Sequence, residues 1–283
     1  MPPPASTPPV GARTELRRQA LAGDSARGLL LTVLGELVLP SGGPGWTAAF
    51  IDALGRLDVE PGTTRQALAR TAAAGWLRPD RVGRRTSWWL TPSGEQLLVE
   101  GTERIYGFAG PAAAWDGRWI IVLASVPESD RRGRHFLRTR LTWAGLGSPS
   151  PGVWVGTHPE RRGEVEDVLR RAGVAASAQV FVGERLGRTP AADLVAQAWD
   201  LSSIDEEYRR FAEDFGSSVA GDPLTRTVEL VHAWRRFPWI DPALPAELLP
   251  EKWKGGAAAD LFRRRHNAWS PAARLEWARL NET

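Results

Sequence analysis

The sequence predicts an α+β multidomain protein with an N-terminal winged helix-turn-helix, a central βαββαβ domain and a helical C-terminal domain. Three observations predict this fold class. A polar helix followed by an arginine-rich hairpin occupies Glu60–Thr91. Short apolar runs alternate with helical periodicity between residues 119 and 184, and helical periodicity alone continues from 194 to 280. At 283 residues, the chain is long enough for two or three domains.

The first predicted helix opens at Asp24 or Ser25 and presents one apolar face. That face consists of residues at three- and four-residue spacing: Ala26, Leu29, Leu30, Val33, Leu34, Leu37 and Val38. The helix ends at PSGGPGW (40–46), a Gly-rich segment that lacks the lysine and hydroxyl of a phosphate-binding loop, so we interpret it as a turn. A second helix follows over Thr47–Leu57, and a third begins at Pro61.

The third predicted helix carries a polar outer stripe. Its inward side holds Leu68 with Thr64, Thr71 and Ala72, and the opposite side holds Thr63, Gln66, Ala69, Arg70 and Ala73. Gln66 and Arg70 lie one turn apart, and these side chains pair bidentately with adenine and guanine, respectively. The sequence therefore predicts that this helix reads base edges in the major groove of DNA.

A basic hairpin is predicted after this helix. Residues 61–90 contain six arginines and a single acid, Asp80. A strand starts at Trp76 and Leu77 and pairs with a second strand at Thr86–Leu90, with the turn near Val82-Gly83. Thr91-Pro92 opens a fourth helix. The predicted DNA-binding residues are Thr63, Arg65, Gln66, Arg70, Arg81, Arg84 and Arg85. A merely solvated surface is the alternative, but three helices, a basic hairpin and a capped fourth helix together favour DNA binding.

The central segment has the element order of a ferredoxin-like domain. Strands are predicted at 119–126, 146–148, 152–157 and 178–184, and helices at 129–144 and 160–172. Only Glu128 lies near the end of the first strand, which argues against a metal-dependent nuclease. The arginine-rich stretch 131–140 is either a solvated helix face or a second surface for nucleic acid or for coenzyme A phosphates.

The C-terminal segment is predicted to be helical, with its last two helices at 257–269 and 271–280. Aromatic and cationic side chains gather near residue 235, and such a set suits a ligand with an apolar group and phosphates. The candidate ligand-binding residues are His232, Trp234, Arg235, Arg236 and Trp239. Aromatic residues at helical spacing also form ordinary cores, so core packing is the alternative.

Composition excludes several classes of protein. The chain has no cysteine, so disulfides, thiolate catalysis and Cys-based metal sites are excluded, and its four histidines show no metal-ligand spacing. We expect neither an enzyme nor a resident cofactor or metal. No apolar run spans a bilayer, and the Pro-rich residues 1–23 are predicted to form a disordered tail. We therefore expect a cytoplasmic protein.

The chain resembles the PaaX-like repressors of phenylacetic-acid catabolism over about Ser25 to Leu280. In the N-terminal segment the resemblance is carried by LLLTVLGELVLPSGGPGWTAAFIDALGRL, RQALARTAAAGWL, GRRTSWWLTPSG and ERIYGF. Further along the chain it is carried by WDGRWIIVLASVPE, LRTRLTWAGLGSPSPGVWVGTH and LVAQAWDL.

The resemblance implies a homodimeric transcription repressor that binds an inverted-repeat operator and is released by an aryl-CoA thioester, typically phenylacetyl-CoA. It implies a winged-helix domain at 24–110, a dimerisation domain at 111–187 similar to the small ferredoxin-like protein of CRISPR adaptation, and a helical effector or dimerisation domain at 188–283. Two alternatives remain. One is a small-molecule-binding or protein-docking protein, and the other is a regulator of a secondary-metabolite pathway with a different ligand.

Overall fold

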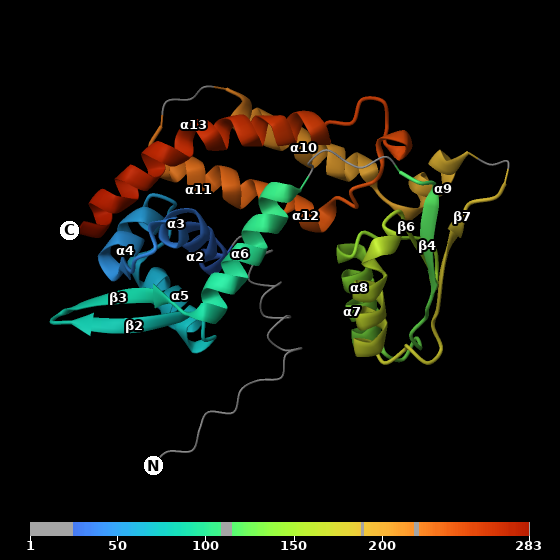
Figure 1. Ribbon diagram of the computed structural model, residues 1–283, viewed down its shortest axis with the longest axis horizontal. Coiled ribbons are helices and arrows are strands. Elements are labelled where there is room, and N and C mark those ends of the chain that lie inside the picture. Colours follow the sequence, from blue (N-terminus) through green and yellow to red (C-terminus); the bar gives the residue numbers. More distant parts are fainter. Residues whose placement is uncertain (1–24, 109–114, 188–189, 218–220, 283) are drawn as a thin grey trace, which may run out of the picture. The chain divides into compact units, whose positions relative to one another are not determined.

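The computed structural model describes residues 25–108, 115–187, 190–217 and 221–282 (Figure 1). The tail predicted at 1–23 lies outside these residues. The chain divides into two compact units. The first comprises Met1–Phe108, Asp214–Arg236 and Asp260–Thr283, and the second comprises Ala109–Glu213 and Phe237–Ala259. Residues of the predicted C-terminal domain therefore contribute to both units.

The first unit is mainly helical. Its elements are α2 (Ala26–Val33), a π-helical turn (Leu34–Val38), α3 (Leu39–Ser41), α4 (Thr47–Gly55), α5 (Pro61–Ala73), α6 (Pro92–Gly107), α11 (Pro223–Trp234) and most of α13 (Gly255–Glu282). Of the two predicted openings of α2, Ser25 is the cap, and its hydroxyl accepts from the Gly28 N–H. Pro40 has no N–H for the Glu36 carbonyl, which explains why the helix widens to a π turn just before it.

A three-stranded antiparallel sheet completes the first unit. Its strands are β1 (Gly45–Trp46), β2 (Leu77–Val82) and β3 (Arg85–Leu90), in the order β1-β3-β2. The β2–β3 hairpin is as predicted, but Gly45 and Trp46 pair with β3 instead of belonging to a plain turn. A side chain at Gly45 would lie 2.4 Å from the Phe50 ring, so only glycine fits where this strand crosses the core.

The core of the first unit joins segments from both ends of the chain. Phe50, Leu54 and Leu68 are fully buried together with Trp277, whose ring centroid lies 5.1 Å from that of Phe50. The Asn281 side chain accepts from the Trp46 N–H at 2.8 Å and donates to the Pro44 carbonyl at 2.8 Å. The last helix therefore packs as an integral part of this unit.

Helix α13 corrects one prediction. Two helices were expected with a break at Ser270, but a single helix runs from Gly255 to Glu282 with Pro271 inside it. Proline removes one main-chain hydrogen bond, normally at a cost of about 3 kcal/mol. Burial of Ala273 and Trp277 directly after Pro271 outweighs that local preference.

The second unit is built on a four-stranded antiparallel sheet. Its elements are β4 (Arg118–Leu123), α7 (Arg131–Trp143), β5 (Gly147–Ser150), β6 (Val153–Gly156), a 3-10 turn (Pro159–Arg161), α8 (Arg162–Arg171) and β7 (Gln179–Glu184). The strand order is β5-β6-β4-β7, and every neighbouring pair is antiparallel. Leu141 and Val165 pack with Ile120 and Val122 on one face, whereas Trp119 belongs to a separate cluster on the other.

Four further elements belong wholly or partly to the second unit: α9 (Ala191–Ala198), α10 (Leu201–Gly216), α12 (Phe237–Ile240) and a 3-10 turn (Ala246–Leu248). The Tyr208 ring stacks on Phe237 at 4.1 Å between centroids, and its hydroxyl donates to Asp241 at 2.6 Å. These contacts hold α12 against the buried side of α10.

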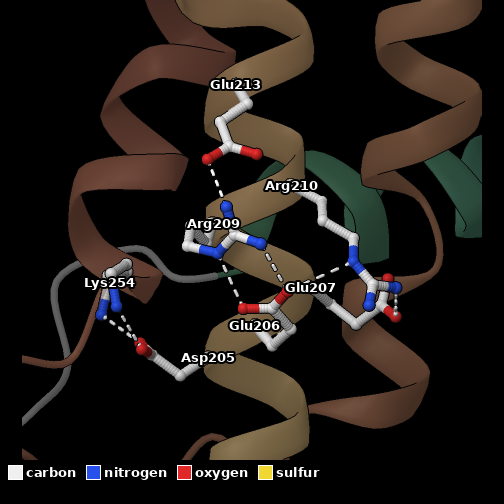
Figure 2. A network of polar contacts seen from close by, with 7 residues as sticks. All are labelled: Asp205, Glu206, Glu207, Arg209, Arg210, Glu213 and Lys254. Carbon is white, nitrogen blue, oxygen red and sulfur yellow. Dashed lines mark hydrogen bonds and ion pairs between the residues drawn. The ribbon is translucent and has the colours of Figure 1, made fainter.

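The exposed side of α10 carries the ion-pair network in Figure 2. Arg209 contacts both Glu206 and Glu213, and Arg210 contacts Glu206 at 3.4 Å and Glu207 at 3.2 Å. Lys254 pairs with Asp205 at the start of the helix. The hydrogen bonds from Arg209 lower the pKa of Glu206 to about 2. Because these charges are solvated and three to four residues apart, the network supports the helix modestly and is sensitive to salt.

Candidate nucleic-acid interface

Helix α5 presents one buried and one exposed face. Thr64, Leu68 and Thr71 are fully buried, and the Thr71 hydroxyl donates to the Ala67 carbonyl at 2.7 Å. This agrees with the predicted inward side. The exposed residues between them form what we call the α5 stripe: Thr63, Gln66, Ala69, Arg70 and Ala73. Two alanines in the stripe keep it narrow, which allows close approach of a large partner.

Backbone geometry ends α5 sharply. Gly75 adopts a left-handed conformation (φ +79°), and the Trp76 N–H returns to the Thr71 carbonyl at 3.2 Å. The Thr91 hydroxyl donates to the Gly75 carbonyl at 2.6 Å and accepts from the Gly94 N–H, so the same residue caps α6. The end of α5 and the start of α6 are thereby fixed to each other.

The hairpin projects arginines at its tip. Val82 pairs with Arg85, which leaves Gly83 and Arg84 as a two-residue turn. Gly83 has φ +62°, as the first position of a type II′ turn requires. Arg81, Arg84 and Arg85 are all exposed. The hairpin seen at β2 and β3 in Figure 1 therefore ends in three cations.

A groove of about 520 Å³ lies where α5, the hairpin and the first turn of α4 meet. Arg65 and Ala69 line it from α5, and Arg84 and Arg85 from the hairpin. Three further lining residues are Trp46 at the end of β1 and Thr47 and Ala48 at the start of α4. The structure thus brings Arg65, Arg84 and Arg85 together, whereas Gln66 and Arg70 lie on the neighbouring stripe.

Sequence patterns did not indicate the role of Trp46 and Thr47. The Arg85 guanidinium lies over the Trp46 ring at 4.3 Å from its centroid. The Thr47 hydroxyl donates to the Thr86 carbonyl at 2.9 Å and accepts from the Trp88 indole at 2.9 Å. These contacts depend on the pairing of β1 with β3, which local sequence patterns do not predict.

The arginines of this surface are available for anions. Within the described residues, none of the five forms an ion pair with an acidic side chain: Arg65, Arg70, Arg81, Arg84 and Arg85. Arg27 adds a sixth cation that sequence analysis missed. It lies over Trp76 at 4.9 Å, and burial followed by the nearby Arg70 charge lowers its pKa. Such crowding of like charges is relieved by a bound polyanion.

Most of the candidate ligand residues near position 235 lie in packed surroundings. Trp234 is buried, stacks on Phe262 at 4.8 Å and donates to the Ile105 carbonyl. His232 contacts the Thr32 hydroxyl at 3.3 Å, and Arg235 is buried beside a cavity of about 30 Å³. That volume suits one water molecule. The exposed Arg236 also belongs to this unit, whereas Trp239 belongs to the second and packs against Trp143.

The second unit contains a larger cleft, of about 830 Å³. Trp115, Arg118, Thr157, His158 and Arg162 are among the residues that line it. His158 bridges the Glu160 carboxylate at 2.9 Å and the carbonyl of Ala243 at 2.8 Å. Ala243 also lines the cleft and has φ +55°, a left-handed conformation that is strained for alanine. The cleft falls within the size range of small-molecule sites.

Three stretches of the chain match families of known proteins. Residues 25–94 match a family described as PaaX-like protein, 112–195 one described as PaaX protein central Cas2-like domain, and 199–279 one described as PaaX-like protein C-terminal domain. The chain belongs to the PaaX-like family. The predicted resemblance is thereby confirmed over nearly the whole described chain.

Two individual relatives of this PaaX-like chain span most of its length. A protein named transcriptional repressor PaaX, from Escherichia coli (strain K12), is 29% identical over 263 residues, which cover 88% of this chain and 82% of that protein. The solved structure of an uncharacterized protein, Rv0674 from Mycobacterium tuberculosis, superposes with a TM-score of 0.61 at 24% identity. It covers 90% of this chain and 98% of the other, and that likeness bears on the fold alone.

The α5 stripe and the hairpin fall within the N-terminal PaaX-like stretch. In the part of the chain that the structure describes, no group of three or more histidine or acidic side chains is arranged to hold a metal ion. Nor does any described helix have the length and apolar character needed to cross a lipid bilayer.

Proposed function

We propose that the chain is a sequence-specific transcriptional repressor that binds double-stranded operator DNA. The observation that carries the proposal is the group of arginines around the narrow α5 stripe that have no acidic partner among the residues the structure describes. Membership of the PaaX-like family and the repressor name of the Escherichia coli relative support it. In this proposal α4, α5 and the hairpin are a winged helix-turn-helix, in which α5 enters the major groove and the hairpin contacts phosphate.

Individual residues take different roles in this interface. Gln66 and Arg70 read base edges from the stripe, and Thr63 lies beside them. The phosphate contacts come from Arg65, Arg81, Arg84 and Arg85. The groove supports this division, because Arg65, Arg84 and Arg85 line it together with the first turn of α4, whose N–H groups have no side-chain cap.

The active form is a homodimer in the cytoplasm that reads an inverted repeat. The order and antiparallel pairing of β4 to β7 support a ferredoxin-like central domain as a dimerisation module. Half-sites separated by whole or near-whole helical turns would match such a dimer. The protein has no catalytic role in this proposal.

A small molecule releases the repressor from DNA. The resemblance points to an aryl-CoA thioester such as phenylacetyl-CoA. The cleft at Arg118 and Arg162 supports the presence of a ligand site, since it offers cations, an indole and enough volume. The ligand residues predicted near Arg235 are the alternative site, and the cavity beside Arg235 would have to open from its present volume of about 30 Å³.

A mobility-shift assay tests this function. The full chain is mixed with DNA from its own promoter region at low salt, with and without phenylacetyl-CoA. We expect a retarded band that persists in the presence of competitor DNA of random sequence. Addition of the thioester should release the DNA, so that the band disappears. Absence of any retarded band would refute DNA binding. A band that random DNA removes equally well would refute sequence-specific repression and favour a general docking role.

A further inference from the structure

Exposed apolar side chains concentrate at one edge of the second unit. The described residues contain seven large hydrophobic side chains that are exposed, and four of them lie on or beside β7. They are Leu123, Phe181, Val182 and Leu186, with exposed fractions of 42%, 50%, 41% and 90%. Isolated exposed apolar residues need no explanation, but a cluster of this kind marks a contact surface.

Strand β7 is also an open backbone edge. It pairs with β4 on one side, and no strand within the described residues pairs with its other side. The strand QVFVGE has six residues, no proline and no cation, and its one charge is Glu184 at the end. It therefore lacks the features with which proteins usually block edge pairing.

The opposite edge of the same sheet is protected. Strand β5 has four residues, contains Pro149 and pairs irregularly with β6. A side chain at Gly147 would lie 2.5 Å from the Ala198 carbonyl, so α9 covers that edge closely. Short length, proline, irregular pairing and a covering helix are all means of blocking an edge. The contrast indicates that β7 is open because it has a partner.

Symmetry limits how two copies of β7 can pair. In an antiparallel pair, directly opposite residues point to the same face of the sheet. A two-fold axis must therefore lie midway between the two copies of one residue, which then face each other. An axis at Phe181 places Phe181 opposite Phe181 of the second copy, and Val180 opposite Val182 twice on the other face. Glu184 then lies opposite Ala178, and Gln179 opposite Gly183. This register joins apolar side chains on both faces and places no like charges opposite each other.

We propose that β7 is the seam of a two-fold symmetric homodimer, in which two copies pair edge to edge about Phe181 and form one continuous sheet of eight strands. The inference deepens the proposed function and rests on it, because it names the surface that makes the dimer. It assigns the seam to a second copy of this chain and to no other partner.

The first test is the mass of the full chain in solution, measured by light scattering after size-exclusion chromatography. We expect the wild type at twice 31.0 kDa, and Phe181→Glu at the monomer mass. Leu275→Glu is the matched control, because Leu275 is 64% exposed in the first unit, and it should stay dimeric. A monomeric wild type, or a dimeric Phe181→Glu variant, would overturn the proposal.

The second test uses the absence of cysteine from the chain. Phe181→Cys places the two new cysteines directly opposite each other. Their Cα atoms would lie about 4.5–5.5 Å apart, which suits a disulfide. Val182→Cys is the register control, because its two thiols are diagonal neighbours about 7–8 Å apart. We expect oxidation to cross-link only the Phe181→Cys variant, as seen on a non-reducing gel. Equal cross-linking of both variants, or of neither, would overturn the register.

The two proposals fail in different ways. If the wild type shows no DNA binding but Phe181→Cys cross-links, the repressor function is wrong and the seam stands. If the wild type binds its operator as a monomer, the seam is wrong and the DNA interface stands. Cross-linking does not require the Phe181→Glu variant to fold, so the seam stays testable if that variant precipitates.

Discussion

The indole nitrogen of Trp88 donates a 2.9 Å hydrogen bond to the hydroxyl of Thr47. The same hydroxyl donates to the Thr86 carbonyl, so a single small side chain fixes β3 to the first turn of α4. This link sets the position of the arginine-bearing hairpin relative to the helices. The geometry of the candidate DNA interface therefore depends on a residue that need not itself contact DNA.

Thr47→Val is expected to destabilise the first unit. It removes two hydrogen bonds, each worth about 0.5–1.5 kcal/mol, and leaves the Trp88 N–H without its acceptor. Urea denaturation should show a lower free energy of unfolding at an unchanged slope. Thr63→Val, on the exposed side of α5, is the control and should change the free energy of unfolding little. Equal stability of Thr47→Val and the wild type would contradict the role of this link.

Gln66→Ala and Arg70→Ala are expected to relax sequence choice, because each removes a contact to a base edge. The discrimination against a substituted base pair should fall by about 1–3 kcal/mol at one position in each half-site. Fluorescence anisotropy with operator variants measures it. If both variants lose affinity equally for operator and random DNA, the two side chains contact only phosphate.

Arg84→Ala is expected to weaken binding to all DNA by a similar factor, since Arg84 lies at the hairpin tip among other cations. The slope of log affinity against log salt concentration should decrease by about 1. Arg170→Ala, which removes an exposed arginine from the second unit, is the charge-matched control. An unchanged slope for Arg84→Ala would show that the tip does not contact phosphate.

Asp241 should make the stability of the second unit fall as pH rises. Burial raises its pKa, although the side chain accepts hydrogen bonds from Tyr208 and the Ala243 N–H. The folded state therefore keeps a proton on Asp241 at pH values where the unfolded state, with a pKa of about 3.9, has released it. The stabilising contribution of this carboxyl is fully present below about pH 3.9 and is lost as pH rises through the raised pKa of the folded state.

Asp241→Asn removes this titration. The stability of the variant relative to the wild type should therefore increase as pH rises above about 4. Asp200→Asn is a control of opposite sign, because Ser203 and Ser202 lower the pKa of Asp200 to about 2. Its relative stability should fall as pH rises from about 2 to about 4 and stay level above that range. Thermal unfolding at a series of pH values measures both, and parallel curves for Asp241→Asn and the wild type would refute the assignment.

Gly94→Ala is expected to be strongly destabilising. A Cβ atom at this position would lie 2.2 Å from the Trp76 carbonyl oxygen, which is main chain and cannot move aside. Gly62→Ala, near the start of α5, meets no atom within 4 Å and should be neutral or stabilising. The melting temperature of Gly94→Ala should therefore fall, whereas that of Gly62→Ala should stay the same or rise. Equal melting temperatures would contradict the close packing at Gly94.

Local patterns predicted the helices and the hairpin well because their causes are local. The spacing of Leu68 and Thr71 identified the buried side of α5, and the arginines around Gly83 identified the hairpin tip. Pairing of Trp46 with β3 could not be predicted in this way, since it depends on contacts with Asn281 and Trp277 far along the chain.

Charge patterns were less informative than spacing in the central segment. The run at 131–140 contains four exposed arginines and one, Arg140, that is only 1% exposed. Arg140 lies over Trp143 at 4.7 Å, and burial followed by the Arg171 charge lowers its pKa to about 10. Helical periodicity alone does not distinguish a buried arginine supported by aromatic rings from a solvated one.

The hydrogen bond between Trp46 and Asn281 joins residues 235 positions apart in the sequence. At translation rates of about 5–20 residues per second, the ribosome needs about 12–47 s to make the segment between them. During that time the emerging N-terminal helices expose the surface that Trp277 later covers. The first unit can therefore complete its folding only after Asn281 has been made, and until then its N-terminal part exposes apolar surface of the kind that favours aggregation and that chaperones bind.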